Sequence, residues 1–228
     1  MKQLSIIIVA LVFSICGCDT DKPAEIPVGT WEYDLLVNGV QLGSATISNK
    51  VEDNHYVYSF DLTMGNGQTQ SNDVIVETLD CKPVKLEKHT YIKAPTQQRL
   101  DIIAECNGKQ ITLTENNSKT VIVLDKDYIL DGNYFLYQLI KNKFKKGREI
   151  QHNVYDPSIE REDVIPVTIT LVGKETIAIN SIPYRAWRVD QSIGKIKNII
   201  IYLDDKGVVL KTSIRMLNMK LDVIRKGL

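Results

Sequence analysis

Residues 131–147, DGNYFLYQLIKNKFKKG, are the one stretch after the first twenty residues whose apolar side chains recur with the period of an α-helix. Asp131 or Asn133 can cap the first turn, and Gly147 tolerates the positive φ at which many helices end. A single helix with so broad an apolar face needs a sheet to lie on. That face carries Phe135, Leu136, Leu139, Ile140 and Phe144.

On both sides of this helix, short runs alternate between apolar and polar side chains, which is typical of antiparallel strands. A parallel sheet would need a crossover connection between its strands, usually a helix, and only one helix is predicted. We therefore predict a mostly β fold: a single large curved antiparallel sheet, an open half-barrel, with the one central helix on its concave face. The predicted strands include residues 55–64, 73–79, 84–93, 98–106, 110–114 and 119–124 before the helix, and 149–155, 164–172, 175–179, 184–190, 197–203, 208–216 and 220–224 after it.

Residues 1–17 are predicted to be a lipoprotein signal peptide. A positive start is followed by residues 4–15, LSIIIVALVFSI, an apolar run that fits a signal peptide and is too short to span a bilayer. Ile15-Cys16-Gly17-Cys18 resembles the bacterial lipobox, with an aliphatic residue at −3, a small residue at −1 and then the lipidated cysteine. We predict cleavage between Gly17 and Cys18, with acyl chains such as palmitate on Cys18. An ordinary signal peptide with incidental cysteines is the alternative.

Residues 18–29, CDTDKPAEIPVG, are polar and contain two prolines, so they are predicted to be the lipidated N-terminus and a flexible tether. Residues 30–228 are predicted to form one antiparallel β domain. We expect the domain to lie in the periplasm of a bacterial cell envelope, held to its membrane by the lipid anchor. Asp19 resembles the retention signal of enterobacterial lipoproteins, which favours the inner over the outer membrane.

The composition excludes some function classes and leaves two cysteines to place. Lys plus Arg and Asp plus Glu each total 28, so there is no basic excess with which to bind nucleic acid. Cys81 and Cys106 flank the predicted hairpin at residues 84–105, in an exported chain where a disulfide can persist. We predict a disulfide between them, with two buried free thiols as the alternative.

No motif in the sequence predicts catalysis. There is no GxSxG elbow, no phosphate-binding loop and no dinucleotide fingerprint. His55, His89 and His152 are too far apart to share a metal-ligand motif, and each is interpreted as a strand residue. We therefore predict no catalytic residue, no metal site, no cofactor and no enzymatic activity.

Two short segments of the chain resemble each other. Residues 79–86, LDCKPVKL, and residues 203–210, LDDKGVVL, both place Asp and Lys in a turn between two strands. Turns commonly reuse such residues, which is one explanation. The other is that the two β-rich halves carry an equivalent hairpin.

Loose motifs in both halves resemble a known group of proteins. They are residues 37–45, VNGVQLGSA; residues 184–189, YRAWRV; and residues 202–210, YLDDKGVVL. The chain resembles a family of uncharacterised exported bacterial lipoproteins whose half-barrel domain is similar to the lipoprotein-carrier superfamily, in which a helix lines the concave face. The resemblance covers most of residues 30–216 and carries no catalytic group. It implies that an apolar ligand is held in the concavity.

These observations lead to one functional prediction and one alternative. We predict a membrane-anchored envelope lipoprotein that binds an apolar or lipidic ligand without catalysis, beside the helix face defined above. The alternative is an envelope scaffold or accessory protein that binds another protein through a sheet edge. The predicted partners are therefore the membrane, an apolar or lipid ligand and an envelope protein, but no nucleic acid.

Overall fold

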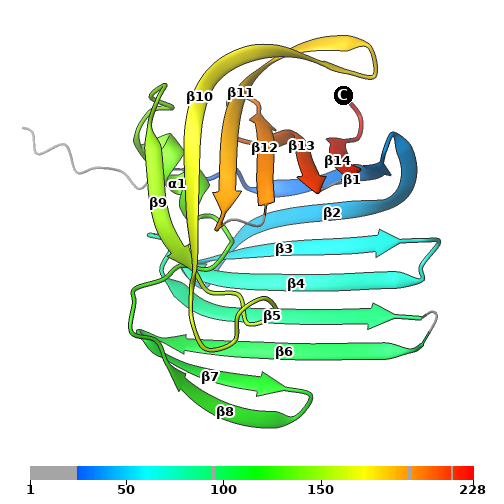
Figure 1. Ribbon diagram of the computed structural model, residues 1–228. Coiled ribbons are helices and arrows are strands. Elements are labelled where there is room, and N and C mark those ends of the chain that lie inside the picture. The colour runs from blue at the N-terminus through cyan, green and yellow to red at the C-terminus, as the bar shows by residue number, and fades with distance from the viewer. Residues whose placement is uncertain (1–24, 94–95, 195–196, 217) are drawn as a thin grey trace, which may run out of the picture.

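A computed structural model describes residues 25–93, 96–194, 197–216 and 218–228. Its fourteen strands form one antiparallel sheet in the order β8-β7-β6-β5-β4-β3-β2-β1-β14-β13-β12-β11-β10-β9 (Figure 1). The first strand, β1 (Gly29–Val37), pairs with the last, β14 (Met219–Arg225), so the two ends of the domain meet in the middle of the sheet. The predicted fold class, a large open antiparallel sheet with one helix, is confirmed.

The sheet consists of two meanders, which we call the N-terminal arm (β1–β8) and the C-terminal arm (β9–β14). Each arm follows from short runs of alternating apolar and polar residues separated by turns. The remaining strands of the N-terminal arm are β2 (Val40–Glu52), β3 (His55–Met64), β4 (Thr69–Thr78), β5 (Pro83–Ile92), β6 (Gln98–Asn107), β7 (Gln110–Glu115) and β8 (Ser118–Val123). Those of the C-terminal arm are β9 (Glu149–Val154), β10 (Ile165–Ile179), β11 (Ile182–Ile193), β12 (Lys197–Leu203) and β13 (Val209–Met216).

One strand differs clearly from its prediction. The segments predicted at residues 164–172 and 175–179 are one strand, β10, which pairs with β11 along most of its length. Gly173 does not end the strand. Its φ of 135° is accommodated by a shift in the pairing register with β11 between Leu171 and Gly173. The sequence signal at Gly173 therefore marks an irregularity in the pairing rather than a turn.

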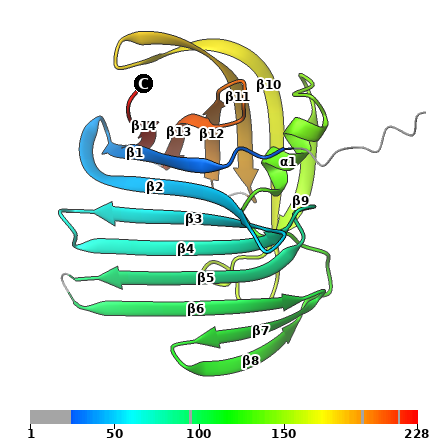
Figure 2. The ribbon, with the colours of Figure 1, turned by 180° about the vertical axis from the view of Figure 1, so that it is seen from behind.

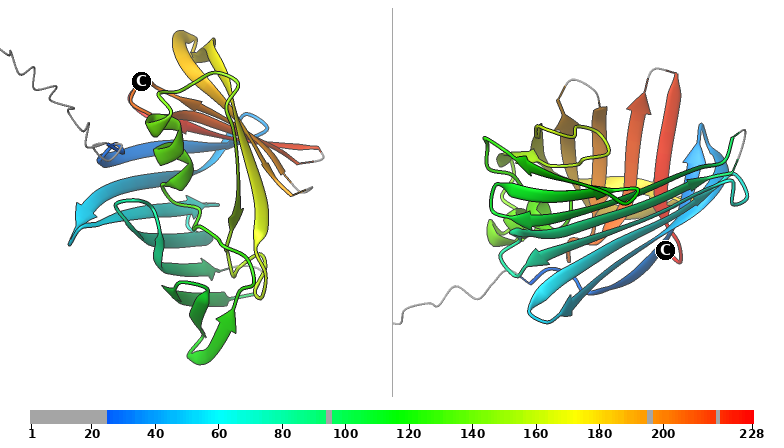
Figure 3. Two further views of the ribbon diagram at one scale, coloured as in Figure 1. Left: turned by 90° about the vertical axis from the view of Figure 1, so that its left-hand side faces the viewer. Right: turned by 90° about the horizontal axis from the view of Figure 1, so that it is seen from below.

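The sheet bends so that the two arms face each other across a trough (Figures 2 and 3). It does not close, because β8 and β9 lie at opposite ends of the strand order. The connection between the arms runs inside the trough, where Ile129 forms an isolated parallel bridge with Val154 of β9. The helix α1 (Tyr134–Lys141) follows this connection and lies near the start of β1.

The helix is shorter than the sequence predicts. It has eight residues and ends at Lys141, with Asn142 as the C-cap, because Lys143 and Phe144 adopt positive φ values of 51° and 49°. The apolar periodicity continues past this end because the Phe144 ring stacks on Trp187, with ring centroids 5.3 Å apart, from a non-helical backbone. Asn133 occupies the N-cap position but makes no side-chain cap. The predicted stop at Gly147 is therefore wrong.

The predicted disulfide is also wrong, because Cys81 and Cys106 are both free thiols. Cys81 lies in the β4–β5 turn with a φ of 59° and is buried in a cluster with Ile26 and Tyr56. Cys106 lies on β6 and packs against a different core cluster, which contains Tyr128. Burial raises the pKa of both thiols. The alternative of two free thiols therefore describes the structure.

The two similar sequence segments do form equivalent hairpins. In the β4–β5 turn, the amide of Thr78 donates to the carbonyl of Lys82 (3.0 Å) and that of Cys81 to Thr78 (2.8 Å). In the β12–β13 turn, Asp204 donates to Val208 (2.9 Å) and Gly207 to Asp204 (3.0 Å). The hydrogen-bond patterns match with an offset of two residues from the sequence alignment. Cys81 therefore corresponds to Gly207, and both occupy positions of positive φ.

The signal peptide, its cleavage site at Gly17 and Cys18, and Asp19 lie outside the described residues. Within the ranges that are described, no helix has both the length and the apolar character needed to cross a bilayer.

Candidate ligand-binding cavity

A cavity of about 360 Å³ lies in the trough between the two arms, which we call the central cavity. The inward-facing side chains of β1–β3 form one wall and those of β10–β14 form the other, with α1 across one end. Most of the side chains that line it are apolar. They include Trp31, Tyr33, Ile47, Tyr58, Phe60, Ile169, Val189, Ile199, Ile201, Leu203, Val209, Ile214 and Val223.

The helix face predicted from the sequence divides between two hollows. Phe135, Leu136 and Leu139 line the central cavity. Ile140 and Phe144 instead line a larger, open groove of about 1160 Å³, which we call the mouth. All five residues therefore lie beside one of these two hollows, and their contact with a ligand stays a prediction.

The mouth and the central cavity adjoin. Pro27, Trp31 and Val208 line both hollows, so the groove and the cavity meet at these three residues. The rest of the mouth is formed by residues 25–28, the end of α1, the β12–β13 turn, and side chains of β2, β3, β11, β13 and the C-terminal residues from β14 onward.

A chain of buried amides ties the helix to the N-terminal segment at the edge of the cavity. The Asn133 side-chain amide donates to Asn49 Oδ1 (3.2 Å), and the Asn49 amide donates to the carbonyl of Pro27 (2.9 Å). Both asparagines are 4% exposed. Buried amides need such partners, so the network fixes the relative positions of β2, α1 and Pro27.

Glu77 lies behind this network and is fully buried. Its Oε2 accepts a hydrogen bond from the backbone amide of Asn133 (2.8 Å), whereas Oε1 has no partner among the described residues. Burial raises the pKa of Glu77 to about 8, although the hydrogen bonds from Asn133 oppose the shift. The carboxyl group is therefore mostly protonated at neutral pH.

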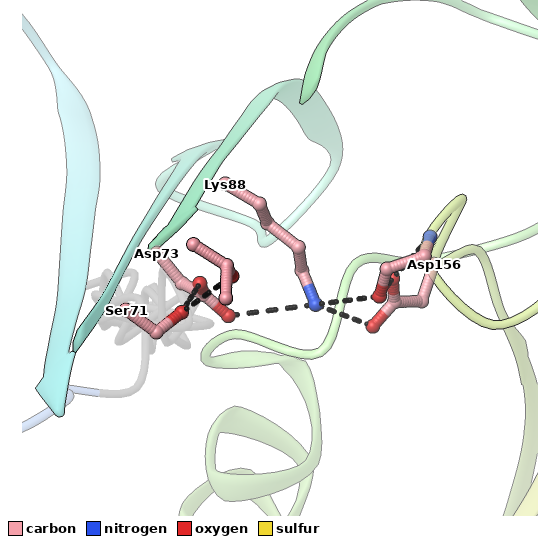
Figure 4. Close-up of polar contacts among 6 residues, drawn as sticks. Ser71, Asp73, Lys88 and Asp156 are labelled. Atoms are coloured by element: carbon pink, nitrogen blue, oxygen red, sulfur yellow. Dashed lines mark hydrogen bonds and ion pairs between the residues drawn. The ribbon is translucent and has the colours of Figure 1, made fainter. Parts of the chain in front are cut away.

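A second, more polar cavity of about 280 Å³ shares Tyr58, Phe60 and Asp131 with the central cavity. The ammonium of Lys88 in this cavity lies 2.6 Å from Asp156 Oδ2 and 3.4 Å from Asp73 Oδ2 (Figure 4). Since Asp156 follows β9, these ion pairs fasten residues 155–164 to the N-terminal arm.

The electrostatics of this cluster favour its charged form. Burial alone lowers the pKa of Lys88, but the attraction of Asp156 and Asp73 outweighs it, and the net effect raises that pKa. Burial likewise raises the pKa of Asp156, and the nearby Lys88 ammonium more than reverses this. Lys88 and Asp156 are therefore charged and form an ion pair at neutral pH.

The described residues contain no group of three or more His, Cys, Asp or Glu side chains that could hold a metal ion. The three histidines lie on β3, β5 and β9, which agrees with their interpretation as strand residues. His89 Nδ1 lies 2.8 Å from Asp101 Oδ1, but His89 neighbours the inward-facing Lys88 on β5 and so points to the outer face. The trough therefore offers a ligand mainly apolar contacts, and a few hydrogen-bonding groups lie at its edge.

The amide network, Glu77 and the cavity walls were not predicted from the sequence. A partial signal was present in β4, where Asp73, Ile75 and Glu77 alternate with outward-facing neighbours and so place two acids on the buried face. The walls could not be predicted because alternation indicates which residues point inward, but not which of them stay uncovered.

An open antiparallel half-barrel with an apolar cavity between its arms defines this molecule as a barrel-like β domain. The chain belongs to the DUF3108 family, described as a protein of unknown function, whose model matches residues 32–223. The predicted membership of an uncharacterised family is thus confirmed, while the exported lipoprotein character of that family and its similarity to the lipoprotein-carrier half-barrel stay predictions. No curated protein matches the sequence.

One solved structure supports the fold. The crystal structure of a beta-barrel-like protein of the domain of unknown function DUF1849 from Brucella abortus is similar over 86% of this chain and 94% of that chain, with a TM-score of 0.62 and 12% sequence identity. A DUF1089 family protein from Pseudomonas aeruginosa is similar over 81% and 89% of the two chains, with a TM-score of 0.40 and 10% identity.

Proposed function

We propose that this protein binds an apolar or lipidic ligand in the central cavity without catalysing a reaction. The observation that carries the proposal is the cavity itself, which is about 360 Å³ in volume and lined mainly by apolar side chains from both arms and α1. Ligand pockets of this kind are mostly apolar, with few polar groups, and have volumes of about 300–1,000 Å³.

The energetics of such binding are favourable for a single chain. Each methylene removed from water contributes about 0.8 kcal/mol, so a segment of ten methylenes contributes about 8 kcal/mol before the cost of ordering the ligand. The amide network around Asn49 and Asn133 fixes this edge of the cavity in advance, which reduces that cost.

The proposal includes a lipid anchor on Cys18 and a location in the cell envelope, with the domain in the periplasm. It is supported by residues 1–18, whose apolar run and lipobox-like end precede the tether and the β domain. Cys18→Ala should move the protein from the membrane fraction to the soluble fraction. A variant that stays firmly bound to membranes would contradict the anchor but not the cavity.

Native mass spectrometry of the Cys18→Ala chain, purified without detergent, tests ligand binding. We expect a co-purifying apolar species that organic extraction releases and identifies. Ile201→Trp should abolish it, because Ile201 lines the cavity. Ile200→Trp is the matched control, since its side chain points to the opposite face of β12. A ligand retained equally by both variants would place binding elsewhere.

A second candidate function is protein binding through the edge strand β8. Among the described strands it pairs with β7 alone, and Val121 and Val123 are 56% and 68% exposed on it. Bare edges with exposed apolar side chains favour the addition of a strand from another chain. Crosslinking in cells should then recover an envelope protein whose capture is lost in Val121→Pro, and an unchanged capture would rule out this edge.

A further inference from the structure

We propose that the mouth faces the bilayer to which the chain is anchored, and that a single-chain amphiphile passes directly from this bilayer into the central cavity. The inference rests on the proposed function and adds to it the source of the ligand, the surface through which the ligand passes and the number of its chains.

The first support is the path of the N-terminal segment. Glu25, Ile26, Pro27 and Val28 line the mouth, and the hydrogen bond from Asn49 to the Pro27 carbonyl holds this segment in place. Cys18 precedes Glu25 by seven residues, and a chain of that length spans at most about 25 Å. A lipid on Cys18 therefore keeps the mouth close to the membrane surface.

The second support is the chemistry of the rim. Val28 and Val51 line the mouth and are 58% and 47% exposed, next to Trp31 and Tyr184. Tryptophan and tyrosine are the aromatic residues that favour the interface between lipid and water. An exposed apolar rim of this kind favours contact with a bilayer over contact with water.

The charges around the mouth are balanced. Glu25, Asp204 and Asp205 carry negative charge, and Arg185, Lys206 and Arg225 carry positive charge. Asp204 also lies 3.5 Å from Arg225, so part of this charge is paired within the protein. The rim should therefore associate with the bilayer mainly through its apolar side chains rather than through selection of anionic headgroups.

The size of the central cavity limits what can enter. Its volume of about 360 Å³ lies at the lower end of the range for ligand pockets, which favours one chain over the two chains of a diacyl lipid. Pro27, Trp31 and Val208 line both the mouth and the cavity, so a chain that moves from one to the other there contacts mainly apolar side chains.

The test compares two sources of one probe, an undecanoic acid that carries a dansyl group. The lipidated full chain is reconstituted into vesicles of phosphatidylethanolamine and phosphatidylglycerol that contain the probe. In parallel, the membrane-free Cys18→Ala chain receives the probe from cyclodextrin. Energy transfer from tryptophan to dansyl reports loading, and Trp31 borders both the mouth and the cavity. We expect faster loading from vesicles than from cyclodextrin.

The rim variant is V28E/V51E, and the control is V121E/V123E on the distant edge strand, where the side chains are similarly exposed. The rim variant should lower the ratio of the vesicle rate to the cyclodextrin rate about fivefold, because charged side chains oppose contact with the bilayer. The control should leave this ratio unchanged.

Two outcomes distinguish a failure of this inference from a failure of the proposed function. Equal ratios in the rim variant and the control would overturn the inference and leave ligand binding intact. If the unaltered chain takes up no probe from either source, the proposed function fails and the inference fails with it.

Discussion

The concave faces of the two arms are covered by different kinds of structure. In the C-terminal arm, α1 places Leu139 in an apolar cluster with Ile169 and Leu171. In the N-terminal arm, two non-helical segments fold inward instead, so that Leu130 and Tyr155 pack against strand residues such as Leu86. The central cavity lies between α1 and these two non-helical segments. The comparison shows that the site exists because one helix cannot cover a sheet of fourteen strands.

The arms also differ in what they bury. The core cluster beneath the helix is apolar, whereas the N-terminal arm buries the carboxyl group of Glu77 and holds the half-buried Lys88 ion pairs. Buried polar groups cost free energy unless they are fully paired. Changing these groups should therefore perturb the N-terminal arm in ways that depend on pH, while changes beneath the helix should not.

The largest expected effect is the pH dependence caused by Glu77. Its pKa in the folded protein is about 8, against an ordinary value of 4.5, so between these values the folded state holds a proton that the unfolded state has released. The free energy of unfolding should therefore fall as pH rises through this window, by about 1.4 kcal/mol per unit and about 5 kcal/mol in all. The stability from this group is complete below pH 4.5 and lost above about pH 8.

Urea unfolding of the Cys18→Ala chain from pH 5 to pH 8.5, with and without Glu77→Gln, measures this contribution. The glutamine keeps an oxygen that can accept the Asn133 hydrogen bond but does not titrate. The variant should lose most of the pH dependence and exceed the parent in stability at pH 8. Parallel curves for the two proteins would show that Glu77 is ionised in the native state.

The next largest effect distinguishes the core of one arm from that of the other. Leu139→Ala and Leu113→Ala each remove a buried leucine, 3% and 2% exposed, and each should cost about 3 kcal/mol. Only Leu139 lines the central cavity, so only its replacement should alter uptake of the dansyl probe. Equal effects of both variants on uptake, after correction for the folded fraction, would contradict the assignment of the site.

The sequence predicted the sheet and the helix because their signals are local. Alternation over a few residues identifies a strand, and strand β3 was predicted with its observed limits, His55–Met64. The end of the helix was missed because Phe144 continues the apolar periodicity through its contact with Trp187, and Trp187 lies 43 residues further along the chain. Periodicity cannot separate a helical turn from a loop that reaches the same core.

The site could be predicted only in part, for a similar reason. The helix contributes its apolar face as its sequence indicates, but the opposite wall comes from Ile47 and Phe60 in one arm and Ile201 and Val209 in the other. Those walls depend on the pairing of β1 with β14, which joins strands from the two ends of the domain. No local pattern in the sequence contains that pairing.

A moderate effect is expected when the ion pairs of Lys88 with Asp73 and Asp156 are removed. Lys88→Met leaves Asp73 and Asp156 without their shared cation and should cost about 2 kcal/mol, since the pair is only partly shielded from solvent. Hydrogen exchange should then become faster in residues 155–164 while α1 stays protected. The double variant with Asp156→Asn should recover part of the loss. Uniform acceleration across both arms would show that the contact does not act locally.

The smallest expected effect compares the two equivalent hairpin turns on either side of α1. At Gly207, a Cβ atom would lie 2.6 Å from Leu136 Cδ1, and the φ of 87° is unfavourable for alanine. Gly207→Ala should therefore cost about 1 kcal/mol, with some relief from movement of the leucine. Cys81 already tolerates a φ of 59° in the matching turn, so Cys81→Ala keeps the strained backbone and loses only the sulfur contacts. Thermal unfolding of both variants is measured with and without the probe. The rise in unfolding temperature caused by the probe should be smaller only in the Gly207 variant, because Gly207 and Leu136 line the cavity and Cys81 does not.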